Sequence, residues 1–134
     1  MLTNFEMVKA FHTAFGQPVR TAPVMPNEAE VALRCNLIEE EYEEYLLAHT
    51  ESEDNNKNLV SIADALTDLL YVVYGAGLYY GIDLDKCFDV VHLSNMSKLG
   101  EDGKPIHRAD GKVLKGPNFF KPNLKDVLFP KVDA

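Results

Sequence analysis

Residues 37–47 read LIEEEYEEYLL, and this stretch decides how the chain folds. It places five glutamates in six consecutive positions, with apolar residues on both sides. At about 100° per residue in a helix, Glu40 and Glu44 fall on the stripe of Leu37, and Glu41 falls on the neighbouring stripe. Some of these acids must therefore project from the margin of an apolar face.

A second acidic pair follows in the next apolar segment, where Asp64 and Asp68 are four residues apart. Acidic runs on helices are most often a solvated surface. Acids in so apolar a helix, however, are seldom buried unless they are paired or bind a cation. Lys and Arg are absent from 35–56 and from 58–85, which leaves Lys57 as the local partner. A divalent metal is the remaining counter-ion, and carboxylate oxygens suit Mg²⁺, with Mn²⁺ as a substitute.

The bulk properties favour one globular domain over residues 1–134. A net charge of −8 argues against binding a nucleic-acid polymer, although metal ions could still bridge a phosphate-bearing ligand to the acids. Residues 1–20 lack a secretory signal, and the longest uncharged apolar run, 69–82, is short for a membrane span, so we expect a cytoplasmic protein without a membrane partner. Cys35 and Cys87 have no metal-ligand spacing, and we expect buried structural thiols.

Hydrophobic spacing predicts an all-α fold, a four-helix bundle with a short, partly extended C-terminal segment. The predicted helices cover residues 3–15, 28–49, 57–80 and 84–98, with extended pieces near 104–108 and 112–115. In the first helix, Phe5, Val8, Phe11 (or His12) and Phe15 would make the inner stripe. Asn27 with Glu30 resembles a capping box, and Gly81 would end the third helix. That helix is apolar nearly all round after Leu69, and Gly75 and Gly77 indicate close helix approach, so we expect packing against a second subunit.

The second and third helices are joined by a short connector and should pack antiparallel. Glu40, Glu41 and Glu44 would then face Asp64 and Asp68 across the gap. So many carboxylates repel one another without cations, whereas Mg²⁺ would stabilise them, neutralise a triphosphate and activate a water. Glu41 is our candidate to accept the proton of that water.

The pattern EExxE at 40–44, followed by an acidic helix, resembles the EExxE…ExxD signature of the all-α NTP pyrophosphohydrolases. This superfamily comprises the MazG-like, phosphoribosyl-ATP pyrophosphohydrolase and dimeric dUTPase relatives, and the phosphoribosyl-ATP branch is the most similar. The further motifs that carry the resemblance are Leu33-Arg34, DLLYVVYG at 68–75, GID at 81–83, HLSNMSK at 92–98 and DGKVLK at 110–115. One position departs from the signature, because Ala65 stands where ExxD requires Glu. Asp64 lies on nearly the same stripe and could substitute for it, which leaves the number of metals open.

The resemblance implies a Mg²⁺-dependent enzyme that cleaves a (deoxy)nucleoside triphosphate between its α and β phosphates, releasing a monophosphate and pyrophosphate. It also implies a homodimer or homotetramer. Its role would be the removal of unwanted nucleotides or the trimming of dUTP. Asn95 and Lys98 would contact sugar or phosphate, Lys112 or Lys115 would contact the distal phosphates, and Tyr71 could flank the base. For the lysines, plain solubility is an equal explanation, and Tyr71 is more often a core residue.

A non-catalytic helical dimer that binds nucleotide or metal is the alternative, with Ala65 as the reason for lost activity. A di-iron carboxylate bundle would need Glu-x-x-His pairs, which the sequence lacks. A P-loop enzyme would need GxxxxGK[ST], which is also absent. The sequence therefore favours the enzyme without fixing its nucleotide.

Overall fold

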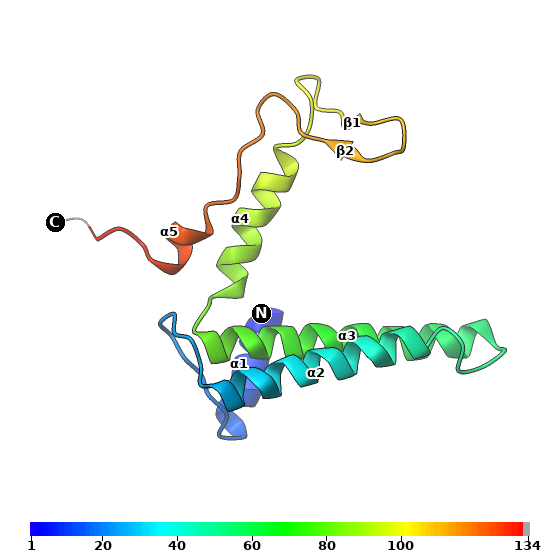
Figure 1. Cartoon of the computed structure of the whole chain (residues 1–134), viewed down its shortest axis with the longest axis vertical. Coiled ribbons are helices and arrows are strands. Elements are labelled where there is room, and N and C mark those ends of the chain that lie inside the picture. The colour runs from blue at the N-terminus through cyan, green and yellow to red at the C-terminus, as the bar shows by residue number, and fades with distance from the viewer. Residues whose placement is uncertain (133–134) are drawn as a thin grey trace. The chain divides into compact units, whose positions relative to one another are not determined.

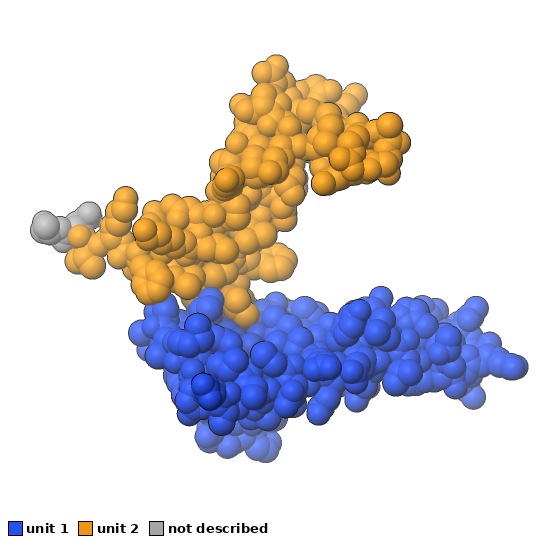
Figure 2. Space-filling view, in the orientation of Figure 1, with its two compact units in different colours: residues 1–82 blue, residues 83–134 orange. Residues whose placement is uncertain are grey.

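The computed structural model describes residues 1–132 (Figure 1). Its contacts divide the chain into two compact units, Met1–Ile82 and Asp83–Ala134, which Figure 2 colours separately. The prediction of one domain over the whole chain stays a prediction.

The first unit consists of three helices: α1 (Asn4–Ala14), α2 (Glu28–Leu47) and α3 (Asn55–Tyr80). The long helix α3 packs against both α2 and α1. The connector between α2 and α3 turns the chain back, so these two helices run antiparallel along one another (Figure 1). The unit is thus an α-hairpin with a third helix across it, and within the acidic run of α2 Glu41 is half-buried while the other four glutamates are exposed.

The caps explain where the helices begin and end. The Asn27 side chain accepts a hydrogen bond from the Glu30 N–H, and the Glu30 side chain accepts one from the Asn27 N–H, so the predicted capping box is confirmed. The Thr3 side chain makes the same arrangement at α1, which the sequence reasoning did not predict. Gly81 ends α3 in the left-handed conformation, as expected.

The inner face of α1 differs in one position from the predicted stripe. Val8 and His12 are buried, and Phe5 and Phe11 are half-buried. Phe15 is 69% exposed and stacks on Phe11 from outside, so its predicted core position is wrong. The α1 helix ends at Ala14, and His12 occupies the inner position instead.

Small side chains let α2 and α3 approach closely. Ala48, which caps the end of α2, and Ala65 on α3 are 1% and 3% exposed. At Gly75, a Cβ atom would lie 2.6 Å from Nη2 of Arg34 and 3.1 Å from Nε2 of His12. The predicted close approach at Gly75 is therefore real, but side chains of α2 and α1 make it rather than a helix backbone.

The second unit holds α4 (Leu84–Met96), a two-residue hairpin and α5 (Leu124–Leu128). Strands β1 (Ile106–His107) and β2 (Val113–Leu114) pair antiparallel at the predicted extended pieces. The chain after the hairpin returns to the end of α4, where Ser94 Oγ donates to the Phe120 carbonyl. The predicted all-α class is confirmed, since the four predicted long helices are present and the described sheet is only this hairpin. Cys35 is exposed and Cys87 half-buried, so the expectation of two buried thiols is wrong.

Helix α3 is unusually apolar for its length. An 18-residue stretch of it has a mean hydropathy of 1.5, so by length and composition alone this helix could cross a membrane, although the uncharged run within it looked too short. One such helix is weak evidence for a membrane protein, because core helices of soluble proteins pass the same test. Asp64 and Asp68 lie within this helix.

The glycine at the end of α3 gives a testable prediction. Gly81 has φ of 68°, and a Cβ atom there would lie within 2.6 Å of the Ala22 carbonyl carbon, against the loop that follows α1. We expect Gly81→Ala to lower the free energy of unfolding by more than about 2 kcal/mol, because it adds a backbone clash to the cost of a left-handed alanine. Urea unfolding measures this difference.

Gly16→Ala is the matched control for that measurement. Gly16 has φ of 69°, but a Cβ atom there would meet nothing within 4 Å. Its substitution should cost about 1–2 kcal/mol, the price of the left-handed conformation alone. Equal losses for the two variants would show that the packing of Ala22 on Gly81 contributes nothing.

Candidate metal centre

One polar contact joins α2 to α3 directly, and another joins α3 to the connector that follows α2. Near the connector, the buried Asn58 side chain donates to the carbonyls of His49 and Ser52 and accepts from the Ser52 N–H. At the other end, Nη2 of Arg34 on α2 donates to the Val72 carbonyl on α3 at 2.8 Å. The acidic residues lie between these two contacts.

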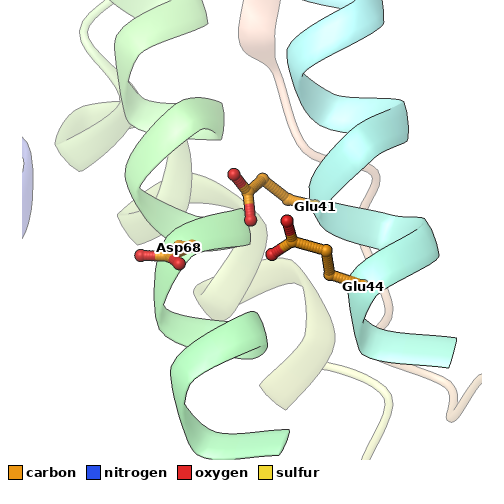
Figure 3. A group of neighbouring side chains, drawn as sticks. All are labelled: Glu41, Glu44 and Asp68. Carbon is orange, nitrogen blue, oxygen red and sulfur yellow. The ribbon is translucent and has the colours of Figure 1, made fainter. Parts of the chain in front are cut away.

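Three carboxylates converge between the helices. Oxygen atoms of Glu41, Glu44 and Asp68 all lie within 4.8 Å of one another. Figure 3 shows both glutamates reaching from α2 toward the turn of α3 that carries Asp68. Glu41 and Asp68 are half-buried, whereas Glu44 is exposed. We call these three residues the carboxylate cluster.

Glu41 has the least favourable electrostatic environment in the cluster. Burial raises the pKa of Glu41, and the charges of Glu44 and Asp68 raise it further. Its Oε2 atom is buried and has no hydrogen-bond partner. No described lysine or arginine forms an ion pair with any of the three carboxylates. Unit charges about 4 Å apart near a protein surface repel by about 4 kcal/mol, so full ionisation requires a counter-ion.

The cluster fits a hard divalent cation. Its donors are all carboxylate oxygens, which Mg²⁺ and Mn²⁺ prefer, and they come from two rigid helices. The unpartnered Oε2 of Glu41 is a buried acceptor that a cation would satisfy. Three ligands leave room for water and for phosphate oxygens, as is usual for Mg²⁺ in nucleotide-processing sites.

Glu40 and Asp64, the other two predicted ligands, lie outside the cluster. Both side chains are exposed. Glu40 is nevertheless close enough to contribute to the raised pKa of Glu41. Ala65, which replaces the expected glutamate, is the residue that faces inward at this turn of α3, so Asp64 is turned outward. Their roles as ligands stay predictions.

Tyr71 lies on the face of α3 that contacts α1. It packs edge-on against Phe11 of α1, with ring centroids 5.6 Å apart. With Tyr74, Met7 and four further residues it lines an apolar cavity of about 230 Å³ between α1 and α3. The ring is thus partly a packing residue, and it also borders a space of the size that a small ligand group would need.

The remaining predicted substrate contacts belong to the second unit. Asn95 is exposed near the end of α4, and its carbonyl accepts from the N–H of Lys98. Lys112 and Lys115 are exposed on the hairpin, where the Lys115 ammonium lies 4.8 Å from the Phe119 ring centroid. The roles of Asn95, Lys98, Lys112 and Lys115 as substrate contacts stay predictions.

Sequence reasoning missed the two residues that hold the helices in place. Arg34 entered only as part of a motif, and Asn58 was not singled out. Arg34 stands seven residues before Glu41, the heptad distance that puts both on one face of α2. That spacing was the available signal, because residues one heptad apart share a face of a helix, so an inward Glu41 implies an inward Arg34.

Three comparisons with known proteins bear on this site. The sequence profile described as phosphoribosyl-ATP pyrophosphohydrolase matches residues 8–95. Over 129 residues the chain is 35% identical to the uncharacterized protein L479 of Acanthamoeba polyphaga mimivirus. The match covers 93% of this chain and 46% of that protein, so the chain spans about half the length of the relative. A crystal structure of a candidate NTP pyrophosphohydrolase from Exiguobacterium sp. 255-15 matches at 26% identity and a TM-score of 0.45, covering 92% of this chain and 91% of that one.

The pKa of Glu41 predicts how stability depends on pH without metal. A carboxylate whose pKa is raised on folding stabilises the fold below its ordinary value of 4.5, and this contribution is lost as pH rises through the raised pKa. In EDTA, Glu41→Gln should therefore gain stability relative to the unaltered protein as pH increases from about 4.5 to 7. Urea unfolding at several pH values measures the difference.

Glu30→Gln provides the opposite control. The hydrogen bond from Arg20 lowers the pKa of Glu30, so the contribution of Glu30 to stability is present above pH 4.5 and is lost as pH falls.

Adding Mg²⁺ should remove the stability advantage of Glu41→Gln at pH 7. A stability difference for Glu41→Gln that does not change with pH would contradict the crowding of the cluster.

Proposed function

The chain belongs to the phosphoribosyl-ATP pyrophosphohydrolase family, and we propose that it is a Mg²⁺-dependent nucleoside triphosphate pyrophosphohydrolase. The family profile covers α2 and α3 completely, including all three members of the carboxylate cluster. This match confirms the resemblance drawn from the motifs.

One observation carries the proposal: oxygens of Glu41, Glu44 and Asp68 lie within 4.8 Å of one another, and no basic side chain among the described residues forms an ion pair with them. An NTP brings several negative charges, so a site of this kind can hold it only together with cations. A bound Mg²⁺ would neutralise phosphate oxygens and acidify the attacking water.

The residues of the chain supply positioning and proton transfer in this proposal. Glu44 and Asp68 would hold the cation from two different helices, and the cation would supply the acidified water. Glu41 accepts a proton from the water as its oxygen bonds to the α phosphorus. The bond from that phosphorus to the bridging oxygen breaks, pyrophosphate leaves with the bond's electron pair, and Glu41 then releases its proton to solvent.

The finer assignments rest on the sequence motifs. Asn95 and Lys98 are proposed contacts to sugar or phosphate, and Lys112 or Lys115 to the distal phosphates. Of these four, only Asn95 lies within the region that the family profile matches. The apolar cavity beside Tyr71 supports a base-binding role for that ring. Removal of unwanted nucleotides or trimming of dUTP is the proposed biological role.

A panel of dNTPs and NTPs with Mg²⁺, assayed for pyrophosphate release, tests the activity. We expect release of pyrophosphate rather than phosphate from at least one substrate. Glu41→Gln, Glu44→Gln and Asp68→Asn should each lower kcat/KM by about a hundredfold or more, because each removes a charge that positions the reacting groups. Asp64→Asn, an exposed acid of the same helix, should cost less than about tenfold.

Two results would overturn parts of this proposal. If the unaltered protein released no more pyrophosphate than Glu41→Gln, the non-catalytic nucleotide- or metal-binding dimer would be the better account. If Asp64→Asn were as damaging as Asp68→Asn, Asp64 would be a ligand despite its exposure, replacing the acid that Ala65 removes.

We further propose that a second copy of the chain covers part of α3. Leu59, Ala63, Leu66, Leu70 and Val73 follow the alternating spacing of four and three residues that is typical of a helix–helix seam, and all are exposed. Only 11% of the most apolar 18-residue stretch is buried in the structure. Such a surface is rarely left to water, and a homodimer or homotetramer would bury it.

Sedimentation of the protein tests this assembly. We expect a mass of two or four chains, and Leu66→Glu should shift the distribution toward the monomer because it places a charge in the seam. Met25→Glu is the control, since Met25 is 77% exposed on a loop away from that stripe. A monomeric unaltered protein, or an unchanged assembly with Leu66→Glu, would rule out this seam as the interface.

A further inference from the structure

Arg34 is a buried cation that the proposed chemistry does not use. Its side chain is 5% exposed, and no described carboxylate forms an ion pair with it. One hydrogen bond is formed, from Nη2 to the Val72 carbonyl, while Nε has no partner. The Tyr79 ring, 4.9 Å from the guanidinium carbon, compensates part of the desolvation. A buried guanidinium with no ion pair and with an unpartnered Nε contributes little to the stability of a fold.

The position of the Arg34 contact is more informative than its strength. Arg34 precedes Glu41 by one heptad on α2, and Val72 follows Asp68 by one helical turn on α3. The hydrogen bond therefore joins the two helices in the layer next to the carboxylate cluster. Its donor is held in place by Gly75, where the guanidinium occupies the space that a Cβ atom would need.

We propose that Arg34 is a positioning residue for the carboxylate cluster, holding α2 and α3 in the register that brings Glu41 and Glu44 opposite Asp68. This inference rests on the proposed function. A cation site tolerates displacements of its ligands of only about 0.5 Å, so a small slide or rotation of α2 would separate the oxygens. A hydrogen bond to a backbone carbonyl resists such movement, whereas apolar packing alone permits it.

Metal affinity separates this role from two others. If Arg34 acted only through its charge, removing it would strengthen cation binding, because a positive charge about 10 Å along the helix opposes a second cation. If Arg34 served only packing, a methionine of similar length would leave the affinity unchanged. Of the three roles, only positioning predicts weaker cation binding after the guanidinium is removed. The direction of the change in cation affinity therefore identifies the role of Arg34.

The experiment measures Mn²⁺ binding by electron paramagnetic resonance, with thermal unfolding as a check on the fold. We expect Arg34→Met to weaken Mn²⁺ binding by about tenfold or more while the metal-free protein unfolds at an equal or higher temperature. Arg20→Met is the matched control. Arg20 also lies over the Tyr79 ring, at 5.7 Å, but bonds the Tyr79 carbonyl and Glu30 rather than the layer beside the cluster. Its Mn²⁺ affinity should match that of the unaltered protein.

A second variant tests the inference if Arg34→Met fails to fold. Gly75→Ala keeps the arginine, but its Cβ atom would lie 2.6 Å from Nη2 and force the guanidinium away from Val72. Alanine also favours the helix, so the fold should persist. We expect the same tenfold loss of Mn²⁺ affinity as for Arg34→Met.

The Mn²⁺ measurements separate the role of Arg34 from the proposed function. If the unaltered protein binds Mn²⁺ and both variants bind it equally well or more tightly, Arg34 is not a positioning residue and the proposed function stands. If the unaltered protein itself binds no Mn²⁺, the proposed metal-dependent function fails, and the role of Arg34 fails with it.

Discussion

The repulsion among three carboxylates held against one another is the constraint on which the rest of this structure depends. Glu41, Glu44 and Asp68 bring negative charge together where no described basic side chain balances it. Without a cation, that arrangement opposes the pairing of α2 with α3. The pairing must therefore be stabilised elsewhere, by burial of Ala48 and Ala65 and by packing of α1 across the hairpin. The site is locally unfavourable and the surrounding fold offsets its cost, as is common where function requires it.

The hairpin is fixed by polar contacts on both sides of the site. Asn58 ties the connector to the start of α3 through hydrogen bonds with backbone groups of His49 and Ser52. Arg34 ties the opposite end to Val72. Small residues at the contact let the helices approach but do not by themselves set their register. Two directional contacts separated along the helices define that register better than a uniform apolar seam would.

The sequence could predict the helices and the region of the site because those depend on local signals. The capping box at Asn27, the left-handed end at Gly81 and the spacing of apolar residues all act over a few positions. The choice of glutamates was harder. Glu40 and Glu44 share a stripe, yet the structure groups Glu41 with Glu44, since the inward face of α2 runs through Arg34, Glu41 and Ala48.

The face that α2 turns inward could not be read from hydrophobicity, because two of its members are charged. Arg34 and Glu41 would each be assigned to the surface by residue type. The same difficulty affects α3, where Asp64 and Asp68 are equivalent in sequence. Ala65 takes the inward position, and this leaves Asp64 exposed and Asp68 at the margin. Tertiary packing decides between such residues, and that information is not local.

The apolar surface of α3 lies beside the carboxylate cluster, so covering that surface would change the solvent around the acids. Leu66 and Leu70 flank Asp68 along the same helix, and both are exposed in one chain. Covering them with the proposed second copy would remove water from the neighbourhood of the acids and strengthen their repulsion, because charges interact more strongly at low dielectric. The same change would strengthen their attraction for a cation. Assembly and cation binding would then favour each other by linkage.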